Sequence, residues 1–238
     1  MELPEKLAEL RLEEALRLLE DSQGALPARG EHATLAQLQQ LIDGLCGLSL
    51  RDGLTGIANL AHFRAMLERE LDRVSRTGEA ATLVLLGVDQ LKHVKDRFGA
   101  VAADRVLRSV AGKLAKWLRP MDFVARVQDE VFGAILPATL TQRGRQVGDR
   151  LRRKIEKMEI DFGGAGRSKV TVSIGGAAVL PWRKSSADEL MRLAERQLYI
   201  ARETGRNRVS FEAHPSTGAT AEERAMLLER FEKGIDDD

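Results

Sequence analysis

The stretch FVARVQDEVFGAIL, residues 123–136, decides how this chain folds. Two apolar runs rich in β-branched and aromatic residues flank the polar tripeptide Gln128-Asp129-Glu130. This pattern predicts a β-hairpin with a polar tip. Two carboxylates at such a tip raise the question whether they serve a catalytic site or are what is left of one.

Segments of strand length and helix length alternate on both sides of the hairpin. The continuous apolar run at 81–88 predicts a strand buried on both faces, and further strands are expected at 169–180 and 207–211. The first expected helix ends near Arg76. Further helices are expected at about 90–97, 101–118, 141–157 and 186–205, and the last has Ser186 as N-cap and Gly205 as stop. Interleaved strands and helices predict an α/β domain of two or three layers.

Three regions are expected along the chain. Residues 1–48 form a helical extension, in which Leu35, Leu38, Leu41, Leu45 and Leu48 recur every three or four positions. This seam fits a short coiled coil or a helical hairpin, but the helices could equally pack on their own domain. Residues 49–212 form the α/β domain, and residues 213–238 a loop, a helix and an acidic end.

Composition excludes several kinds of site and partner. The 37 basic and 36 acidic side chains nearly cancel, so no bulk field favours nucleic acid or an anionic membrane. Cys46 is the only cysteine, which excludes an internal disulfide and a cysteine-based zinc site. The sequence has neither an apolar run of membrane-spanning length nor a secretory signal at its start, so a cytoplasmic location is expected.

Five segments resemble, in order, the GGDEF domain of diguanylate cyclases. They are RDGLTGIAN at 51–59, VDQLKHVKDRFGAVAADRVL at 88–107, the hairpin, VTVSIGGA at 170–177 and LYIARETGRNRV at 198–209. The resemblance implies a palm-like fold with a mostly antiparallel sheet of about five strands and flanking helices. It also implies the family's reaction, in which two subunits join two GTP molecules into cyclic di-GMP with the help of carboxylate-bound metal ions.

The residues at the family's catalytic positions depart from its pattern. Arg126 and Pro137 fix the alignment, so that G-G-D-E-F becomes Gln128-Asp129-Glu130-Val131-Phe132. Both glycines that let the backbone approach a phosphate are absent, and Gly87 replaces the main metal-binding Asp. Glu130 alone keeps an acid at a metal-ligand position. We therefore expect no catalytic residues, no metal site and no required cofactor.

Part of the family's GTP site is retained. Asp104 matches a guanine-reading Asp, and Arg202 and Arg206 match basic residues that hold phosphates. Lys95 replaces the family's guanine-reading Asn. Magnesium would be expected only if GTP still binds through this set.

Arg119-x-x-Asp122 has the spacing of the family's product-inhibition site, and Arg150 matches the further Arg of that site. A guanidinium can bond the O6 and N7 atoms of guanine, and a carboxylate can accept hydrogen bonds from its N1–H and N2–H groups. The same short pattern also arises by chance as a surface salt bridge. The resemblance favours binding of cyclic di-GMP by Arg119, Asp122 and Arg150.

The sequence thus predicts a catalytically inactive GGDEF domain that acts as a cyclic di-GMP receptor, relays to an unidentified protein partner and forms a homodimer. No membrane or nucleic-acid partner is expected. A nucleotide-independent interaction scaffold and a weak residual cyclase or GTP-binding domain remain as alternatives. Trp117 and Trp182 are expected to be packing groups.

Overall fold

The computed structural model describes residues 50–162 and 166–212. The predicted helical extension at 1–48, with its leucine seam, and the predicted helix within 213–238 lie outside the described residues. The elements are, in order, α3 (Leu60–Thr77), β1 (Ala81–Val88), α4 (Leu91–Phe98), α5 (Ala100–Trp117), β2 (Phe123–Gln128), β3 (Val131–Leu136), α6 (Thr141–Glu156), β4 (Glu159–Asp161), β5 (Arg167–Lys169), β6 (Val172–Val179), α7 (Ala187–Glu203) and β7 (Val209–Phe211).

A five-stranded sheet with the order β2-β3-β1-β6-β7 forms the centre of the domain. β1 pairs antiparallel with β3 on one side and β6 on the other, and only the β6–β7 pair is parallel. All eight residues of β1 are buried, as the continuous apolar run predicted. The expected mostly antiparallel α/β fold is therefore confirmed.

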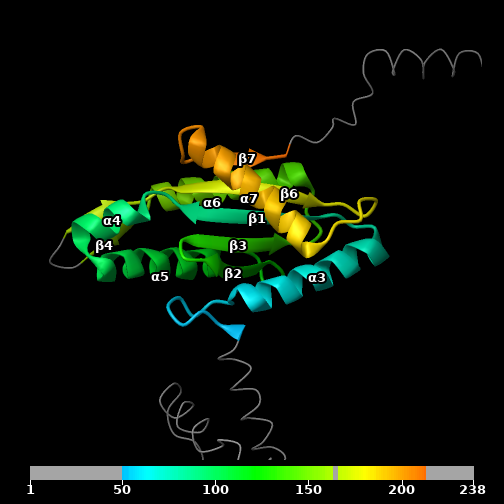
Figure 1. Cartoon of the computed structure of the whole chain (residues 1–238), viewed down its shortest axis with the longest axis horizontal. Helices are drawn as coiled ribbons and strands as arrows, with labels where there is room; N and C mark the ends of the chain where they lie inside the picture. The colour runs from blue at the N-terminus through cyan, green and yellow to red at the C-terminus, as the bar shows by residue number, and fades with distance from the viewer. Residues whose placement is uncertain (1–49, 163–165, 213–238) are drawn as a thin grey trace, which may run out of the picture.

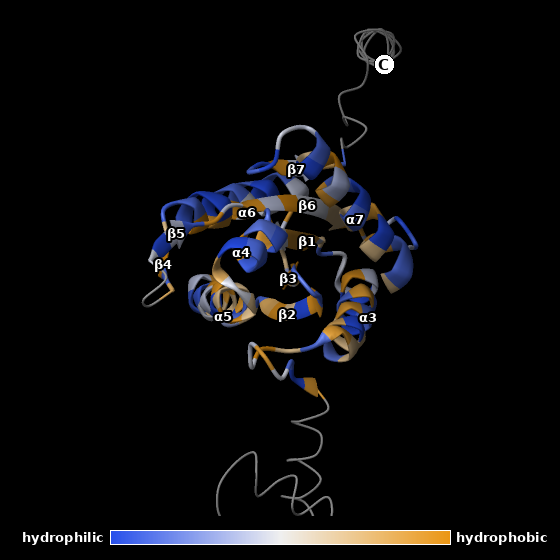
Figure 2. Ribbon diagram, turned by 60° about the vertical axis from the view of Figure 1, so that its left-hand side comes forward, coloured by the Kyte–Doolittle hydropathy of each residue, from blue (hydrophilic) through white to orange (hydrophobic). Residues whose placement is uncertain are grey.

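Helices cover both faces of this sheet, which makes three layers (Figures 1 and 2). Side chains alternate along β1 because successive residues of a strand point to opposite faces. Leu83 and Leu85 pack with residues of α3 and α7, whereas Val84 and Leu86 pack with residues of α5 and α6. Figure 2 shows the five strands of this sheet in a central column, with α4, α5 and α6 on one side and α3 and α7 on the other.

Capping groups fix both helices of the α3/α7 layer. The Asn59 side chain accepts a hydrogen bond from the backbone N–H of His62 at the start of α3. Ser186 accepts one from the N–H of Glu189 at the start of α7, which confirms it as the predicted N-cap. Gly78 ends α3 in the left-handed conformation that glycine adopts without a steric penalty.

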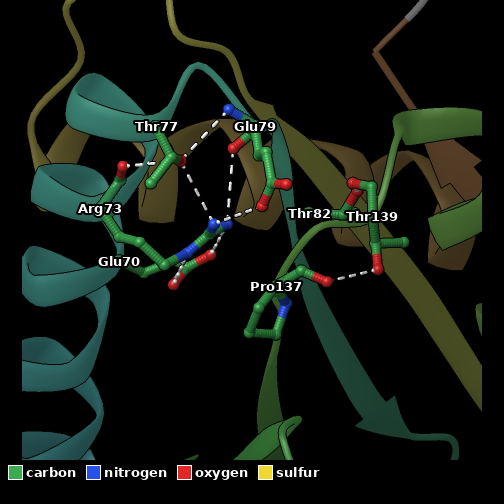
Figure 3. A network of polar contacts seen from close by, with 7 residues as sticks. All are labelled: Glu70, Arg73, Thr77, Glu79, Thr82, Pro137 and Thr139. Carbon is green, nitrogen blue, oxygen red and sulfur yellow. Dashed lines mark hydrogen bonds and ion pairs between the residues drawn. The ribbon is translucent and has the colours of Figure 1, made fainter.

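The end of α3 is tied to the start of β1 by polar contacts (Figure 3). Arg73 donates to both carboxylate oxygens of Glu70, at 2.9 and 2.8 Å, and reaches Glu79 at 3.0 Å. The hydrogen bonds that Arg73 donates to the Glu70 carboxylate raise the pKa of Arg73. Thr82 of β1 donates to the carbonyl oxygen of Thr139 at 2.7 Å. These contacts stabilise the end of the sheet opposite the hairpin tip.

One hairpin was missed, and two expectations were wrong. The hairpin of β4 and β5 was not predicted, because two strands of three residues each are too short to show a recognisable alternation. The strand expected at 169–180 accordingly begins only at Val172. Trp182 is not a packing group, since 74% of its surface is exposed. In the described ranges, no helix combines the length and apolar character needed to cross a membrane.

Candidate functional site

The predicted hairpin is present, and Asp129 and Glu130 form its tip. Arg126 pairs with Phe132, and a register shift follows before Gln128 pairs with Val131. The carbonyl oxygen of Glu130 accepts a hydrogen bond of 2.9 Å from the N–H of Val88, at the end of β1. The tip therefore lies directly beside the end of the central strand.

Arg126 fixes the tip to the segment that precedes α3. Its Nη2 and Nε atoms donate to the carbonyl oxygen of Asp129, at 2.6 and 3.2 Å. Its Nη1 atom lies 3.2 Å from both carboxylate oxygens of Asp52. Burial raises the pKa of Asp52, but hydrogen bonds from Thr55 and Arg126 outweigh this effect and lower it. In the sequence, Arg126 served only to align the hairpin with the family pattern, and nothing there indicated that it bridges the tip and Asp52.

Arg202 of α7 reaches the position at which the resemblance implies a metal ion. Its Nη2 atom lies 2.7 Å from Oε1 of Glu130, the one acid kept at a metal-ligand position. A Cβ atom on Gly87 would lie only 2.9 Å from Cζ of Arg202 and closer still to Nη2. The guanidinium of Arg202 therefore occupies the space that a side chain at position 87 would need.

These residues do not fit a divalent metal ion. The carboxylate of Glu130 is already neutralised by a cation, and a second positive charge at the same place would be repelled. Asp89, the acid two residues after Gly87, is buried and its carboxylate is already occupied. It accepts hydrogen bonds from Thr171 Oγ1 and Ser173 Oγ, both at 2.7 Å, and from the N–H of Asn207 at 3.1 Å. No group of three or more metal-binding side chains is found among residues 50–162 and 166–212.

A cavity of about 500 Å³ opens between the hairpin tip and helices α4 and α5. Its lining comprises Leu91, Lys92, Lys95, Asp96, Ala100, Ala103, Asp104, Leu107, Arg126, Asp129 and Glu130. Of the residues predicted for a residual GTP site, Asp104 lines the cavity, and Arg202 contacts its wall through Glu130. Arg206 is exposed in the turn after α7 and does not line the cavity.

The turn between α5 and β2 holds the first two residues of the predicted dinucleotide site. Oδ2 of Asp122 accepts a hydrogen bond of 2.9 Å from the backbone N–H of Arg119, and the N–H of Asp122 donates to the carbonyl oxygen of Arg119 at 3.0 Å. Asp122 thus fixes the Arg119 backbone. The Arg119 side chain is exposed and makes no ion pair with any residue that the structure describes.

Arg150 lies on α6, in a shallow groove of about 330 Å³ lined by Gln146, Asp149, Arg150, Arg153, Lys154 and Lys157. Asp149 pairs with Arg152 and Arg153 at 3.0 and 2.7 Å, and Arg150 has no carboxylate partner within the described ranges. One turn further along α6, Lys154 Nζ lies 5.0 Å from the ring centroid of Trp117, two residues before Arg119. The contact brings the segments that carry Arg119 and Arg150 side by side.

Three contacts of these sites were not predicted from the sequence. They are the Arg202–Glu130 ion pair, the Arg126–Asp52 ion pair and the cation–π contact between Lys154 and Trp117. The one usable signal was Gly87 within a run of branched apolar residues. A glycine inside a strand often marks the close approach of another group.

The family described as "Diguanylate cyclase, GGDEF domain" matches residues 49–208. Diguanylate cyclase DgcP of Pseudomonas aeruginosa is 38% identical over 162 residues, which are 68% of this chain and 24% of that protein. Probable diguanylate cyclase DgcT of Escherichia coli is 35% identical over 160 residues, which are 67% of this chain and 35% of that protein. The chain thus spans roughly a quarter to a third of the length of these two relatives.

Solved structures show the same fold. The coiled coil and GGDEF domain of DgcB from Caulobacter crescentus, in complex with c-di-GMP, gives a TM-score of 0.70 at 26% identity and covers 74% of this chain and 93% of that one. Diguanylate cyclase SiaD from Pseudomonas aeruginosa, in complex with its activator SiaC, gives 0.66 at 28% identity and covers 87% of this chain and 73% of that one.

Proposed function

Because this chain belongs to the GGDEF family of diguanylate cyclases, we propose that it is a catalytically inactive member that binds cyclic di-GMP and signals to a protein partner. The proposed binding residues are Arg119, Asp122 and Arg150. The observation that carries this proposal is the exposed guanidinium of Arg119, whose backbone is held by Asp122.

The geometry of the turn supports guanine binding. The backbone hydrogen bond uses Oδ2 of Asp122, so its Oδ1 atom can accept from the N1–H or N2–H group of a base. The Arg119 guanidinium, which pairs with no described carboxylate, offers a planar set of donors for O6 and N7. One residue pair could therefore contact two edges of the same guanine.

Arg150 supports the same ligand from the neighbouring helix. It is exposed, and the groove around it carries three further cations, Arg153, Lys154 and Lys157. Two negatively charged phosphates link the two guanosines of cyclic di-GMP, and this concentration of positive charge favours them. The DgcB structure, a relative of similar fold, was solved with c-di-GMP bound.

Catalytic inactivity is supported by the contact between Gly87 and Arg202. Phosphoryl transfer in this family depends on metal ions, and an internal guanidinium takes the place of the cation here. Losing one element of charge stabilisation lowers a rate by roughly two or more decades. Purified protein incubated with GTP and Mg²⁺ or Mn²⁺ is therefore expected to form no cyclic di-GMP, and steady product formation would overturn this part of the proposal.

Isothermal titration calorimetry with cyclic di-GMP tests the binding site. Removing Arg119 in Arg119→Ala is expected to cost about 2 kcal/mol, or roughly thirtyfold in Kd, because one bidentate contact to guanine is lost. Arg150→Ala is expected to weaken binding as well. Arg196→Ala is the matched control, because it removes an equal charge from the exposed surface of α7, on the other face of the sheet. No binding to the wild type, or equal binding to Arg119→Ala, would contradict the proposal.

The cavity at the hairpin tip favours a second candidate function, GTP binding without turnover. Lys95 of α4 and Asp104 of α5 both line it and could contact a base. Titration with GTP in the presence and absence of Mg²⁺ separates this function from the receptor, because Asp104→Ala would abolish GTP binding and leave cyclic di-GMP binding unchanged.

A protein partner completes the proposed function. SiaD, a relative of similar fold, was solved with a protein activator. We propose an analogous but unidentified partner for this chain, and a homodimer in solution. Copurification with and without cyclic di-GMP tests the first part, and light scattering tests the second.

A further inference from the structure

Trp117 and Lys154 form a contact beside the proposed dinucleotide site that no part of that proposal uses. Trp117 ends α5 and packs partly against the core between α5, α6 and the sheet. Lys154 Nζ covers the ring at 5.0 Å from its centroid. Within the described ranges, Lys154 pairs with no carboxylate, and its ammonium group contacts the Trp117 ring instead.

The direction of the two helices decides how this contact lies relative to Arg119 and Arg150. β2 starts and β3 ends at the same end of the sheet, because Phe123 pairs with Ile135. From Trp117 the chain runs through Arg119 toward this end, where β2 begins, and α6 starts shortly after β3 ends. Moving back along α6 from Lys154 to Arg150 leads toward the same end.

Arg119 and Arg150 therefore lie on one side of the Trp117–Lys154 contact. Residues four apart on a helix share one face, so Arg150 and Lys154 point the same way from α6. Both line the groove of about 330 Å³ on this helix. Arg119 follows Trp117 by two residues, and Arg150 precedes Lys154 by one helical turn, so a ligand that contacts both arginines would lie next to the Trp117–Lys154 contact.

We propose that Trp117 is the stacking platform for one guanine of cyclic di-GMP, and that Lys154 leaves the ring on binding to face a phosphate. This inference rests on the proposed function, adds Trp117 to its site and gives Lys154 a specific role there. Stacking of a base on an aromatic ring contributes more than an exposed cation–π contact, so the exchange favours the bound state. The Lys154 ammonium also gains an anionic partner that it lacks in the free protein.

Tryptophan fluorescence reports directly on this exchange. The chain has two tryptophans, so Trp182→Phe leaves Trp117 as the only indole. Titration of Trp182→Phe with cyclic di-GMP is expected to quench the Trp117 emission, with the same Kd that calorimetry gives for this variant. Calorimetric binding without any change in Trp117 emission would overturn the inference.

Binding to substituted proteins provides a second readout. Trp117→Leu is expected to weaken cyclic di-GMP binding roughly tenfold, because one stacked base is lost. Lys154→Gln is expected to weaken binding and to reduce its dependence on salt concentration, because one phosphate contact is removed. Lys116→Gln is the charge-matched control, since Lys116 is exposed and is not the residue that covers the ring. Circular dichroism and thermal unfolding check that each variant is folded.

The outcomes separate this inference from the proposed function. One outcome is that the wild type binds cyclic di-GMP, Arg119→Ala does not, the Trp117 emission is unchanged and Trp117→Leu binds like the wild type. The receptor function then stands, and the stacking role of Trp117 is wrong. If wild type binds nothing, both are wrong. If Trp117→Leu does not fold, the emission of Trp117 in Trp182→Phe decides the question alone.

Discussion

Arg202 of α7 and Glu130 at the hairpin tip form an ion pair, with 2.7 Å between Nη2 and Oε1. The Arg202 guanidinium lies where a side chain at position 87 would otherwise be. The three residues come from three elements that meet at one end of the sheet. Each accounts for another: Gly87 leaves the space, Arg202 fills it, and Glu130 neutralises the charge. The site thus contains its own cation.

Gly87→Ala is expected to destabilise the protein by about 1 kcal/mol, because the new Cβ displaces the guanidinium and weakens a partly exposed ion pair. In an Arg202→Ala background the same substitution should cost nothing, since the space is then empty. A double-mutant cycle by urea denaturation measures this coupling. Additive effects would show that Gly87 and Arg202 are independent.

Divalent metal ions are expected to leave the thermal unfolding of the wild-type protein unchanged. The double variant Gly87→Asp/Arg202→Ala removes the internal cation and adds a carboxylate near Glu130, so Mn²⁺ should now bind and stabilise. Stabilisation of about 1.4 kcal/mol is expected at a Mn²⁺ concentration ten times Kd. Differential scanning calorimetry with and without Mn²⁺ measures it. Stabilisation of the wild type by Mn²⁺ would contradict the interpretation that Arg202 takes the place of the metal ion. Gly87→Asp alone, which keeps Arg202, is a further comparison.

Much of the fold could be predicted because it depends on hydrophobic pattern. The continuous apolar run at 81–88 predicted that β1 is buried on both faces, and Ser186 predicted the start of α7. The hairpin at 123–136 was readable from its polar tip. The strands β4 and β5 could not be predicted, because strands of three residues each show no recognisable period.

The site was only partly predictable, because its contacts join residues far apart in the chain. The sequence indicated that Gly87 removes a ligand and that Arg202 is basic, but their contact depends on how α7 packs on β6. The Arg119–Asp122 spacing indicated a pair, but the hydrogen bond runs to the backbone and leaves the guanidinium exposed. The Trp117–Lys154 contact depends on the arrangement of α5 and α6, for which no local pattern exists.

Stability at acid pH should depend on Asp52. Burial raises its pKa, but the hydrogen bonds from Thr55 and Arg126 lower it below the unfolded value of about 3.9. A carboxyl group with a lowered folded-state pKa stabilises the protein above its unfolded pKa, and this contribution is lost as pH falls through the folded pKa. Wild type should therefore exceed Asp52→Asn in free energy of unfolding at pH 7, with the difference shrinking below about pH 4.

Urea denaturation of both proteins between pH 3 and 7 measures this difference. Asp188→Asn is the matched control, because Asp188 forms an exposed ion pair with Arg64 and its pairing contributes little. A difference between wild type and Asp52→Asn that is constant over the whole range would show that the hydrogen bonds do not depend on ionisation.

Gly175 of β6 is expected to tolerate no side chain, because α7 lies directly on it. A Cβ there would lie 2.7 Å from the Cα of Leu198 and closer to the N of Leu198 and the O of Ala194, all of them backbone atoms of α7 that cannot turn away. Gly175→Ala should therefore separate the helix from the sheet and cost about 3 kcal/mol, the upper end for overpacking. Gly112→Ala is the matched control, since nothing lies within 4 Å of its Cβ position on α5 and the gain in helix propensity is about 1 kcal/mol. Urea denaturation should move the two variants in opposite directions, and equal stability of Gly175→Ala and wild type would contradict the close packing of α7 on β6 that places Arg202 at Gly87.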